Sequence, residues 1–165
     1  MTRVYVPATL AMLQRLVDDR EFAAVNHTAF AVTPALREAY SSGDDEELAE
    51  AAMSEAALAS LRLLASEDGD VVFRRAVVAA DVDAVTPRPD LDDAVVRLSG
   101  PIPLDKVASV HIDLAEAERD VERAVAVVDA ADLGDPDAEI TVGDAEDHEL
   151  AWYARQELPF LLELL

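Results

Sequence analysis

The sequence predicts an α+β or α/β fold: a mixed β-sheet of about five strands, layered with a long central helix and two or three further helices. The longest helical pattern of apolar residues covers residues 44–66. Before it, strand-like segments are separated by helices, which favours parallel pairing; after it, they follow one another closely, which favours antiparallel pairing. A chain of 165 residues can bury a core, so we expect a single α+β domain over residues 1–165.

The long helix, from Asp44 to Ser66, is expected to be buried on more than one side. Its strongly polar positions cover less than half of the circumference, and most of the remainder is apolar. We therefore expect Leu58 and Leu61 to fill the core, and replacing either by aspartate to prevent folding. Asp44 offers an N-cap, and Asp68-Gly69 offers a stop. The polar positions are Glu47, Glu50, Glu55 and Arg62.

The first forty residues are predicted to form a strand, a helix, a second strand and a short helix. Apolar residues alternate in the strand segments and recur at helical spacing between them. Thr33-Pro34 supplies an N-cap and a first-turn proline for the short helix. The predicted strands are Thr2–Val6 and Thr28–Thr33, and the predicted helices are Thr9–Asp19 and Pro34–Tyr40.

Three strands are predicted after the long helix. Val71–Ala80 is rich in β-branched residues and has no polar residue from Ala76 onward, which is typical of a strand at the centre of a sheet. Ala94–Leu98 is the second. Val107–Ile112 is the third, and its two faces differ because Ser109 and His111 lie on one of them.

The last fifty residues are predicted to form a helix, a possible edge strand and a final helix. Asp113 and Glu116 make a D-x-x-E capping pattern for the first helix. The possible edge strand is Glu139–Val142. The final helix is expected from Glu146 onward, with Pro159 bending or restarting it because proline lacks the backbone N–H donor.

Composition excludes several classes of function. There is no cysteine, so disulfides, zinc–thiolate sites and cysteine nucleophiles are absent. The formal net charge of −22 disfavours binding to nucleic acid or to anionic membranes. No P-loop, G-x-G-x-x-G, G-x-S-x-G or H-E-x-x-H pattern occurs, so no cofactor is expected. With neither an export signal nor a long apolar run, we expect a cytoplasmic protein.

His111 and Asp113 form the candidate metal site. They lie two residues apart at the end of a strand, so their side chains project from the same face. Further ligands would have to come from elsewhere in the fold. A hydrogen-bonded structural histidine and a helix-capping aspartate are the alternative interpretation.

Arg74 and Arg75 form the candidate anion site. Neighbouring guanidinium groups can bind an anionic ligand through paired hydrogen bonds. The alternative is that both arginines are ion-paired with carboxylates from the surrounding helices.

The C-terminal segment is the candidate interface. It contains the only tryptophan and a run of large apolar residues after Pro159. These residues would either bind a protein partner or a second copy of the chain, or plug the core of their own chain. The candidate interface residues are Trp152, Tyr153, Phe160, Leu161 and Leu164.

Five stretches of the chain, taken together, resemble an uncharacterised family of actinobacterial proteins. They are VYVPATLAMLQRL, AFAVTPALREAY, RRAVVAADV, VHIDLAEAE and HELAWYARQEL. The resemblance implies a free-standing bacterial cytosolic protein with a strand–helix opening and a tryptophan-bearing C-terminal helix. It implies no activity, ligand or catalytic residue.

Two functions therefore stand as hypotheses. The first is a small acidic interaction or accessory domain without catalytic activity, because no catalytic motif is present and the C-terminal segment is apolar and aromatic. The second is an enzyme or sensor with a small-molecule or metal pocket near His111 and Asp113. A closed pocket that gathers His111, a second histidine and a carboxylate would favour the second hypothesis; a flat surface would favour the first.

Overall fold

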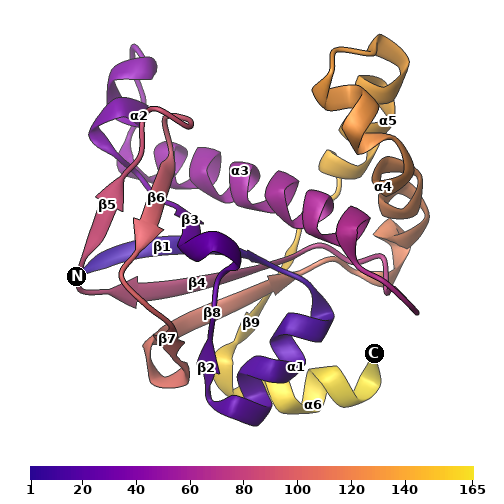
Figure 1. The fold of residues 1–165 in the computed structure, drawn as a ribbon, viewed down its shortest axis with the longest axis horizontal. Helices are drawn as coiled ribbons and strands as arrows, with labels where there is room; N and C mark the ends of the chain where they lie inside the picture. The colour runs from indigo at the N-terminus through magenta and orange to yellow at the C-terminus, as the bar shows by residue number, and fades with distance from the viewer.

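A seven-stranded antiparallel sheet forms the centre of the molecule (Figure 1). The computed structural model describes all of residues 1–165. The strands of this sheet are β1 (Thr2–Ala8), β3 (Thr28–Phe30), β4 (Ala76–Val82), β5 (Val85–Pro87), β6 (Val95–Leu98), β8 (Val107–Ile112) and β9 (Ala151–Ala154). Their order is β5-β6-β3-β1-β4-β8-β9, so β1 is the middle strand. A separate two-stranded sheet pairs β2 (Glu21–Phe22) with β7 (Ile102–Pro103).

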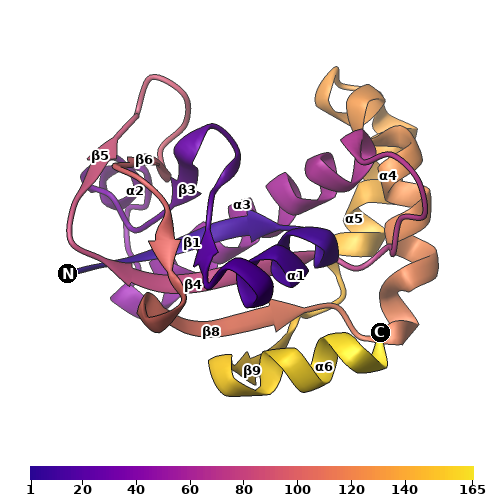
Figure 2. The ribbon, with the colours of Figure 1, turned by 60° about the horizontal axis from the view of Figure 1, so that its bottom comes forward.

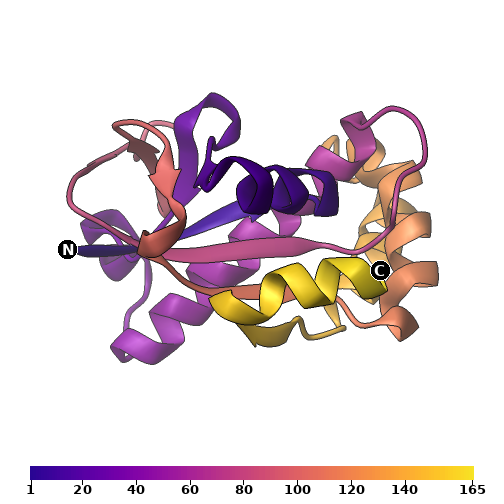
Figure 3. The same cartoon turned by 90° about the horizontal axis from the view of Figure 1, so that it is seen from below.

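Six α-helices surround the large sheet. They are α1 (Leu10–Asp19), α2 (Pro34–Ala39), α3 (Asp45–Ser66), α4 (Glu118–Asp132), α5 (Pro136–Glu146) and α6 (Leu158–Leu164). α3 crosses one face of the sheet, with α2 near its start and α4 and α5 near its end (Figure 1). α1 lies on the opposite face (Figure 2), where α6 packs beside it (Figure 3). No helix combines the length and the apolar character needed to cross a membrane.

The helices begin where capping residues place them. The side-chain oxygens of Thr9, Thr33 and Asp44 each accept a hydrogen bond from the backbone N–H three residues later, at the starts of α1, α2 and α3. These caps confirm the predicted helix starts in the first half of the chain. Pro159 lies in the first turn of α6, so it restarts the chain as a new helix.

The face of the sheet that carries α1 and α6 is covered by apolar side chains. Val4, Val6 and Ala8 of β1 point to this side and are fully buried. They belong to a cluster of 20 buried apolar residues that includes Leu13 and Leu16 of α1. This cluster is the main hydrophobic core, because burial of so many apolar side chains is the dominant favourable term in folding.

α3 links two smaller clusters. Its first half packs on the sheet with Leu48, Ala52 and Ala56, and its second half packs on α4 and α5 with Leu61 and Leu64. Leu61 is fully buried, as predicted, while Leu58 is only half-buried. The long helix is therefore buried on more than one side, as its wide apolar arc indicates.

Ser60 ties α3 to the two central strands. Its hydroxyl donates a hydrogen bond to the carbonyl of Ala8 at 2.7 Å and accepts one from the N–H of Ala76 at 3.0 Å. The side chain is fully buried, so these two bonds satisfy polar groups that would otherwise lie unpaired in the core.

The α+β class is confirmed, but the sheet differs from the predicted one. It has seven strands, and every neighbouring pair is antiparallel. The strand predicted over residues 71–80 is observed as β4, which begins only at Ala76. It is not the middle strand of the sheet but lies next to it, beside β1. The helical connection through α2 and α3 joins β3 and β4, which run in the same direction, but β1 lies between them and pairs antiparallel with both, so no parallel pair forms.

Three predictions for the last fifty residues are wrong. Asp113 does not cap a helix, because its carboxylate pairs with Arg75 and α4 begins only at Glu118. Residues 139–142 lie within α5, which Asp135 caps and Pro136 opens. The segment with Trp152 is the strand β9, because tertiary pairing with β8 overrides its helical spacing.

Candidate functional site

A cleft of about 850 Å³ lies between α3 and the sheet. Strands β1, β4, β8 and β9 form one wall, to which they contribute Tyr5, Ala79, His111 and Trp152. α3 forms the opposite wall, and residues 146–150, which run from the last residue of α5 to the start of β9, line the cleft as well. The cleft is thus the part of this face of the sheet that α3 does not fill.

One stripe of α3 lines the cleft. Its positions recur at intervals of three and four residues, so they share one side of the helix. The first half of the stripe carries two glutamates, whereas its last member is buried against the sheet. The stripe consists of Glu46, Ala49, Glu50, Met53, Ser54 and Ala57.

The strand wall is polar and aromatic. His111 of β8 lies directly opposite Trp152 of β9, and the side chain of Trp152 is 60% exposed. His111 Nε2 lies 3.0 Å from the hydroxyl oxygen of Ser109. Burial, assisted by the charge of Arg3, lowers the pKa of His111, so the imidazole is neutral at neutral pH. Burial also raises the pKa of Tyr5, so its phenol stays protonated.

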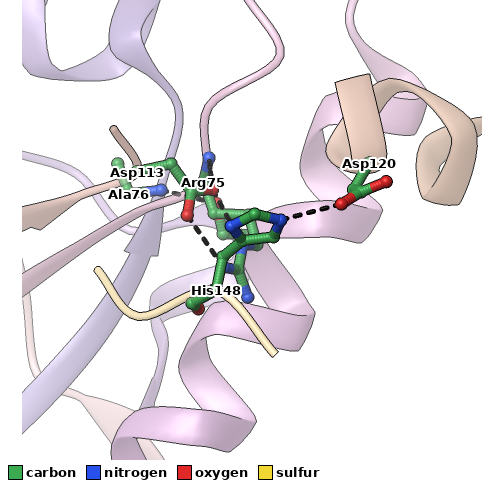
Figure 4. Close-up of polar contacts among 6 residues, drawn as sticks. Arg75, Ala76, Asp113, Asp120 and His148 are labelled. Atoms are coloured by element: carbon green, nitrogen blue, oxygen red, sulfur yellow. Dashed lines mark hydrogen bonds and ion pairs between the residues drawn. The ribbon is translucent and has the colours of Figure 1, made fainter. Parts of the chain in front are cut away.

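A buried ion pair joins Arg75, which lines the cleft, to Asp113 (Figure 4). Nε and Nη2 of Arg75 donate hydrogen bonds to the two carboxylate oxygens of Asp113, each at 2.8 Å. The backbone N–H of Arg75 donates to the same carboxylate at 2.8 Å, and Nη2 also donates to the carbonyl of His148. The side chains of Arg75 and Asp113 are 3% and 0% exposed. Such a pair is stable only because its hydrogen bonds are nearly complete.

The 146–150 segment is anchored by His148. Its imidazole Nε2 lies 2.8 Å from a carboxylate oxygen of Asp120 on α4, while its carbonyl accepts the bond from Arg75 (Figure 4). The segment is thereby fixed to both α4 and the sheet. This anchoring holds Glu146, Asp147 and Glu149 at the edge of the cleft.

A family model matches residues 2–162 of the chain, and it describes a family of unknown function (DUF6912). The chain belongs to this family. No curated protein sequence and no solved structure matches it. The match covers nearly the whole chain, including every residue that lines the cleft.

The two candidate metal ligands of this DUF6912 chain have different surroundings in the structure. His111 lines the cleft beside Ser109, whereas both carboxylate oxygens of Asp113 are engaged by Arg75. No group of three or more histidine, aspartate or glutamate side chains is arranged to hold a metal ion. A metal site at His111 and Asp113 would need the Arg75 pair to break, and it stays a prediction.

The candidate anion-binding arginines are both ion-paired. Arg74 Nε lies 2.7 Å from a carboxylate oxygen of Glu118, and Arg75 pairs with Asp113. The alternative interpretation, pairing with nearby carboxylates, therefore describes both side chains. Arg75 still lines the cleft, and its Nη1 atom has no hydrogen-bond partner within the chain.

The candidate interface residues are divided between the two sides of the sheet. Trp152 lines the cleft on the α3 side, whereas Tyr153 and Leu161 pack against the core on the α1 side. Phe160 and Leu164 of α6 are 71% and 83% exposed. The C-terminal segment therefore covers its own core with one side and presents apolar side chains on the other.

Sequence reasoning missed most of the cleft. Glu46 and Glu50 resemble ordinary solvent-facing glutamates, and Tyr5 resembles the outer face of a strand. One signal was available: Ser109 and His111 make one face of a strand polar, which indicates that this face is not fully packed. Which helix lies across that face follows only from the tertiary structure.

Proposed function

We propose that this protein is a small acidic binding protein that holds a small organic ligand in the cleft between α3 and the sheet, without catalysing a reaction. The observation that carries the proposal is the cleft itself, with a volume of about 850 Å³ on the polar face of the sheet. Ligand sites typically measure about 300–1,000 Å³ and combine apolar walls with a few polar groups. The cleft gathers His111, His148 and several carboxylates, the combination that favours a pocket over a flat docking surface.

The cleft favours binding over catalysis. Its one pair of nucleophile and base is Ser109 and His111, and Ser109 is only 5% exposed. In a serine–histidine–aspartate triad a carboxylate orients the imidazole, but here Asp113 is committed to Arg75. We infer that Ser109 and His111 serve as hydrogen-bonding groups. Labelling of Ser109 by a fluorophosphonate probe would argue for the alternative, a serine hydrolase.

The only tryptophan of the chain lines the cleft, so its fluorescence tests the proposal directly. A library of small organic compounds is screened for changes in Trp152 emission and in melting temperature, because a ligand that binds the folded state raises stability. Ala49→Phe, which fills the cleft, should abolish the responses. Ala65→Phe, on an exposed position of the same helix outside the cleft, should leave them unchanged. Responses that persist in Ala49→Phe would refute the proposed site.

A second candidate function is self-association through α6. Phe160 and Leu164 are exposed on a helix whose other side covers the core, and such apolar side chains commonly form interfaces between copies of a chain. Light scattering over a range of concentrations should show a dimer that Phe160→Asp/Leu164→Asp converts to a folded monomer. A monomeric mass at all concentrations would exclude this function.

We further propose that the protein acts in the cytoplasm. The absence of cysteine agrees with a reducing compartment, where disulfides do not stabilise proteins. Localisation of a tagged full-length chain by cell fractionation tests this.

A further inference from the structure

The carboxylates around the cleft have no partners. Five of them line it, two from α3 and three from the 146–150 segment, and none takes part in an ion pair or a side-chain hydrogen bond. They are Glu46, Glu50, Glu146, Asp147 and Glu149. Elsewhere in the chain, arginines pair with nearby carboxylates, as in Arg62 with Asp132. Five free carboxylates thus line the cleft, although unpaired carboxylates such as Glu47 also occur elsewhere on the chain.

The positive groups of the cleft are already neutralised. Arg3 pairs with Asp81 at 2.8 Å, and Arg75 pairs with Asp113. The imidazole of His111 is held neutral by burial, which lowers its pKa. The cleft therefore presents a negative rim around an uncharged floor, and an anion would meet net repulsion there.

Two features of the floor favour a particular shape of ligand. Tyr5 and Trp152 offer aromatic faces, which attract cations and stack on planar groups. Arg75, whose side chain is 3% exposed, keeps Nη1 without a hydrogen-bond partner. Nη1 is accessible to solvent, since the only buried side-chain nitrogen or oxygen without a partner is Nε of Arg97, so this N–H can donate to an acceptor that enters the cleft. An oxygen on the ligand can supply that acceptor.

We infer that the cleft binds an organic cation: an amine or guanidine on a flat or short apolar body that carries an oxygen acceptor. The ammonium or guanidinium group lies among the rim carboxylates, the body lies against Tyr5 and Trp152, and the oxygen faces Arg75. This inference rests on the proposed function, since it names the ligand class of the same site. The competing explanation is that the rim is acidic only because the whole chain carries a net charge of −22.

The test compares three compounds of nearly equal size and shape that differ in charge: tyramine, tyrosol and para-hydroxyphenylacetate. Binding is followed by Trp152 fluorescence and by calorimetry. Tyramine should bind at least about tenfold more tightly than neutral tyrosol, and the anion should bind more weakly than both. A short peptide with blocked termini, in which one arginine is the only charged residue, is titrated in parallel and distinguishes a free amine from the basic side chain of a protein partner; binding of either compound supports the inference.

Two matched variants distinguish the effect of the carboxylates that line the cleft on tyramine affinity from the effect of the overall net charge. Glu50→Gln should weaken tyramine binding about tenfold, the loss of one charge-assisted contact. Glu47→Gln removes the same charge from the same helix outside the cleft and should leave affinity unchanged. Equal losses in both variants would overturn the inference in favour of diffuse attraction.

Other outcomes distinguish the two proposals. Equal affinities for all three compounds, or tightest binding of para-hydroxyphenylacetate, would overturn the cationic ligand while leaving a small-molecule site in place. If neither tyramine nor the arginine peptide binds but neutral library compounds do, the cationic ligand is again overturned. If no compound of any charge changes Trp152 emission, the proposed function itself is refuted.

Discussion

The two faces of the central sheet use the same strands for different purposes. On the α1 face, Val110 and Ile112 of β8 join a continuous apolar core. On the α3 face, the alternate residues Ser109 and His111 of the same strand line an open cleft. On the α3 face, the apolar cluster between the first half of α3 and the sheet contains 9 buried residues, against 20 on the other side, and the cleft lies beside it. One face supplies most of the stability, which leaves the polar part of the other available for binding.

The contrast also concerns charge. The α1-side cluster consists entirely of apolar residues, whereas the α3 side contains the buried pair of Arg75 and Asp113. Buried pairs contribute little net stability compared with apolar residues of the same volume. We infer that this pair is retained because it holds Arg75 in the lining of the cleft and fixes the segment that carries His148.

The largest loss of stability is expected from a charged residue on the α1 face of the sheet. Val110→Asp places an unpaired carboxylate in a fully buried site, at a cost of several kcal/mol against a total stability of about 5–15 kcal/mol, and should prevent folding. His111→Asn changes the next residue, on the cleft side, and should give a folded protein. Circular dichroism and denaturant unfolding measure both. A folded Val110→Asp variant would contradict the assignment of the two faces.

The next largest effect is expected at the buried pair. Asp113→Ala leaves the guanidinium of Arg75 buried without its partner, so it should lower the free energy of unfolding by about 3–5 kcal/mol. Replacing both residues, as in Arg75→Met/Asp113→Leu, should restore most of that loss while altering the cleft. Denaturant melts compare the three proteins. A double variant as unstable as the single one would show that the pair itself stabilises the fold.

A smaller effect is expected from pH. Burial holds the pKa of His111 below its ordinary value of about 6.5, so the unfolded chain binds more protons between those two pKa values. The contribution of His111 to stability is therefore full above about pH 6.5 and is lost as the pH falls toward the folded-state pKa. His111→Asn should reduce the slope of unfolding free energy against pH in this range. An unchanged slope would mean that the imidazole is not desolvated.

The smallest effect is expected at the exposed edge of the α3 face. The side chains of Arg3 and Asp81 pair at 2.8 Å but are 47% and 38% exposed, and solvent screens their interaction. Arg3→Ala should therefore lower stability by about 0–1 kcal/mol. The same measurement on Asp113→Ala provides the buried comparison. If Arg3→Ala lowered the free energy of unfolding as much as Asp113→Ala does, burial would not be what distinguishes the two ion pairs.

The sequence by itself determined the α+β class, most of the elements in the first two thirds of the chain and the burial of Leu61. Helix starts at Thr9, Thr33 and Asp44 follow local capping chemistry, which depends on a few neighbouring residues and can be read from them. The same holds for the polar face of β8, because alternation along a strand is a local property. These features need no knowledge of distant partners.

Tertiary structure alone decided the rest. The segment around Trp152 has helical spacing, yet pairing with β8 makes it a strand. Asp113 has the pattern of a helix cap, yet Arg75, 38 residues away in sequence, takes its carboxylate. The cleft exists because α3, four strands and the 146–150 segment meet at one place, and its free carboxylates come from two elements far apart in the chain. Such contacts depend on three-dimensional arrangement, which residue patterns within a single segment do not encode.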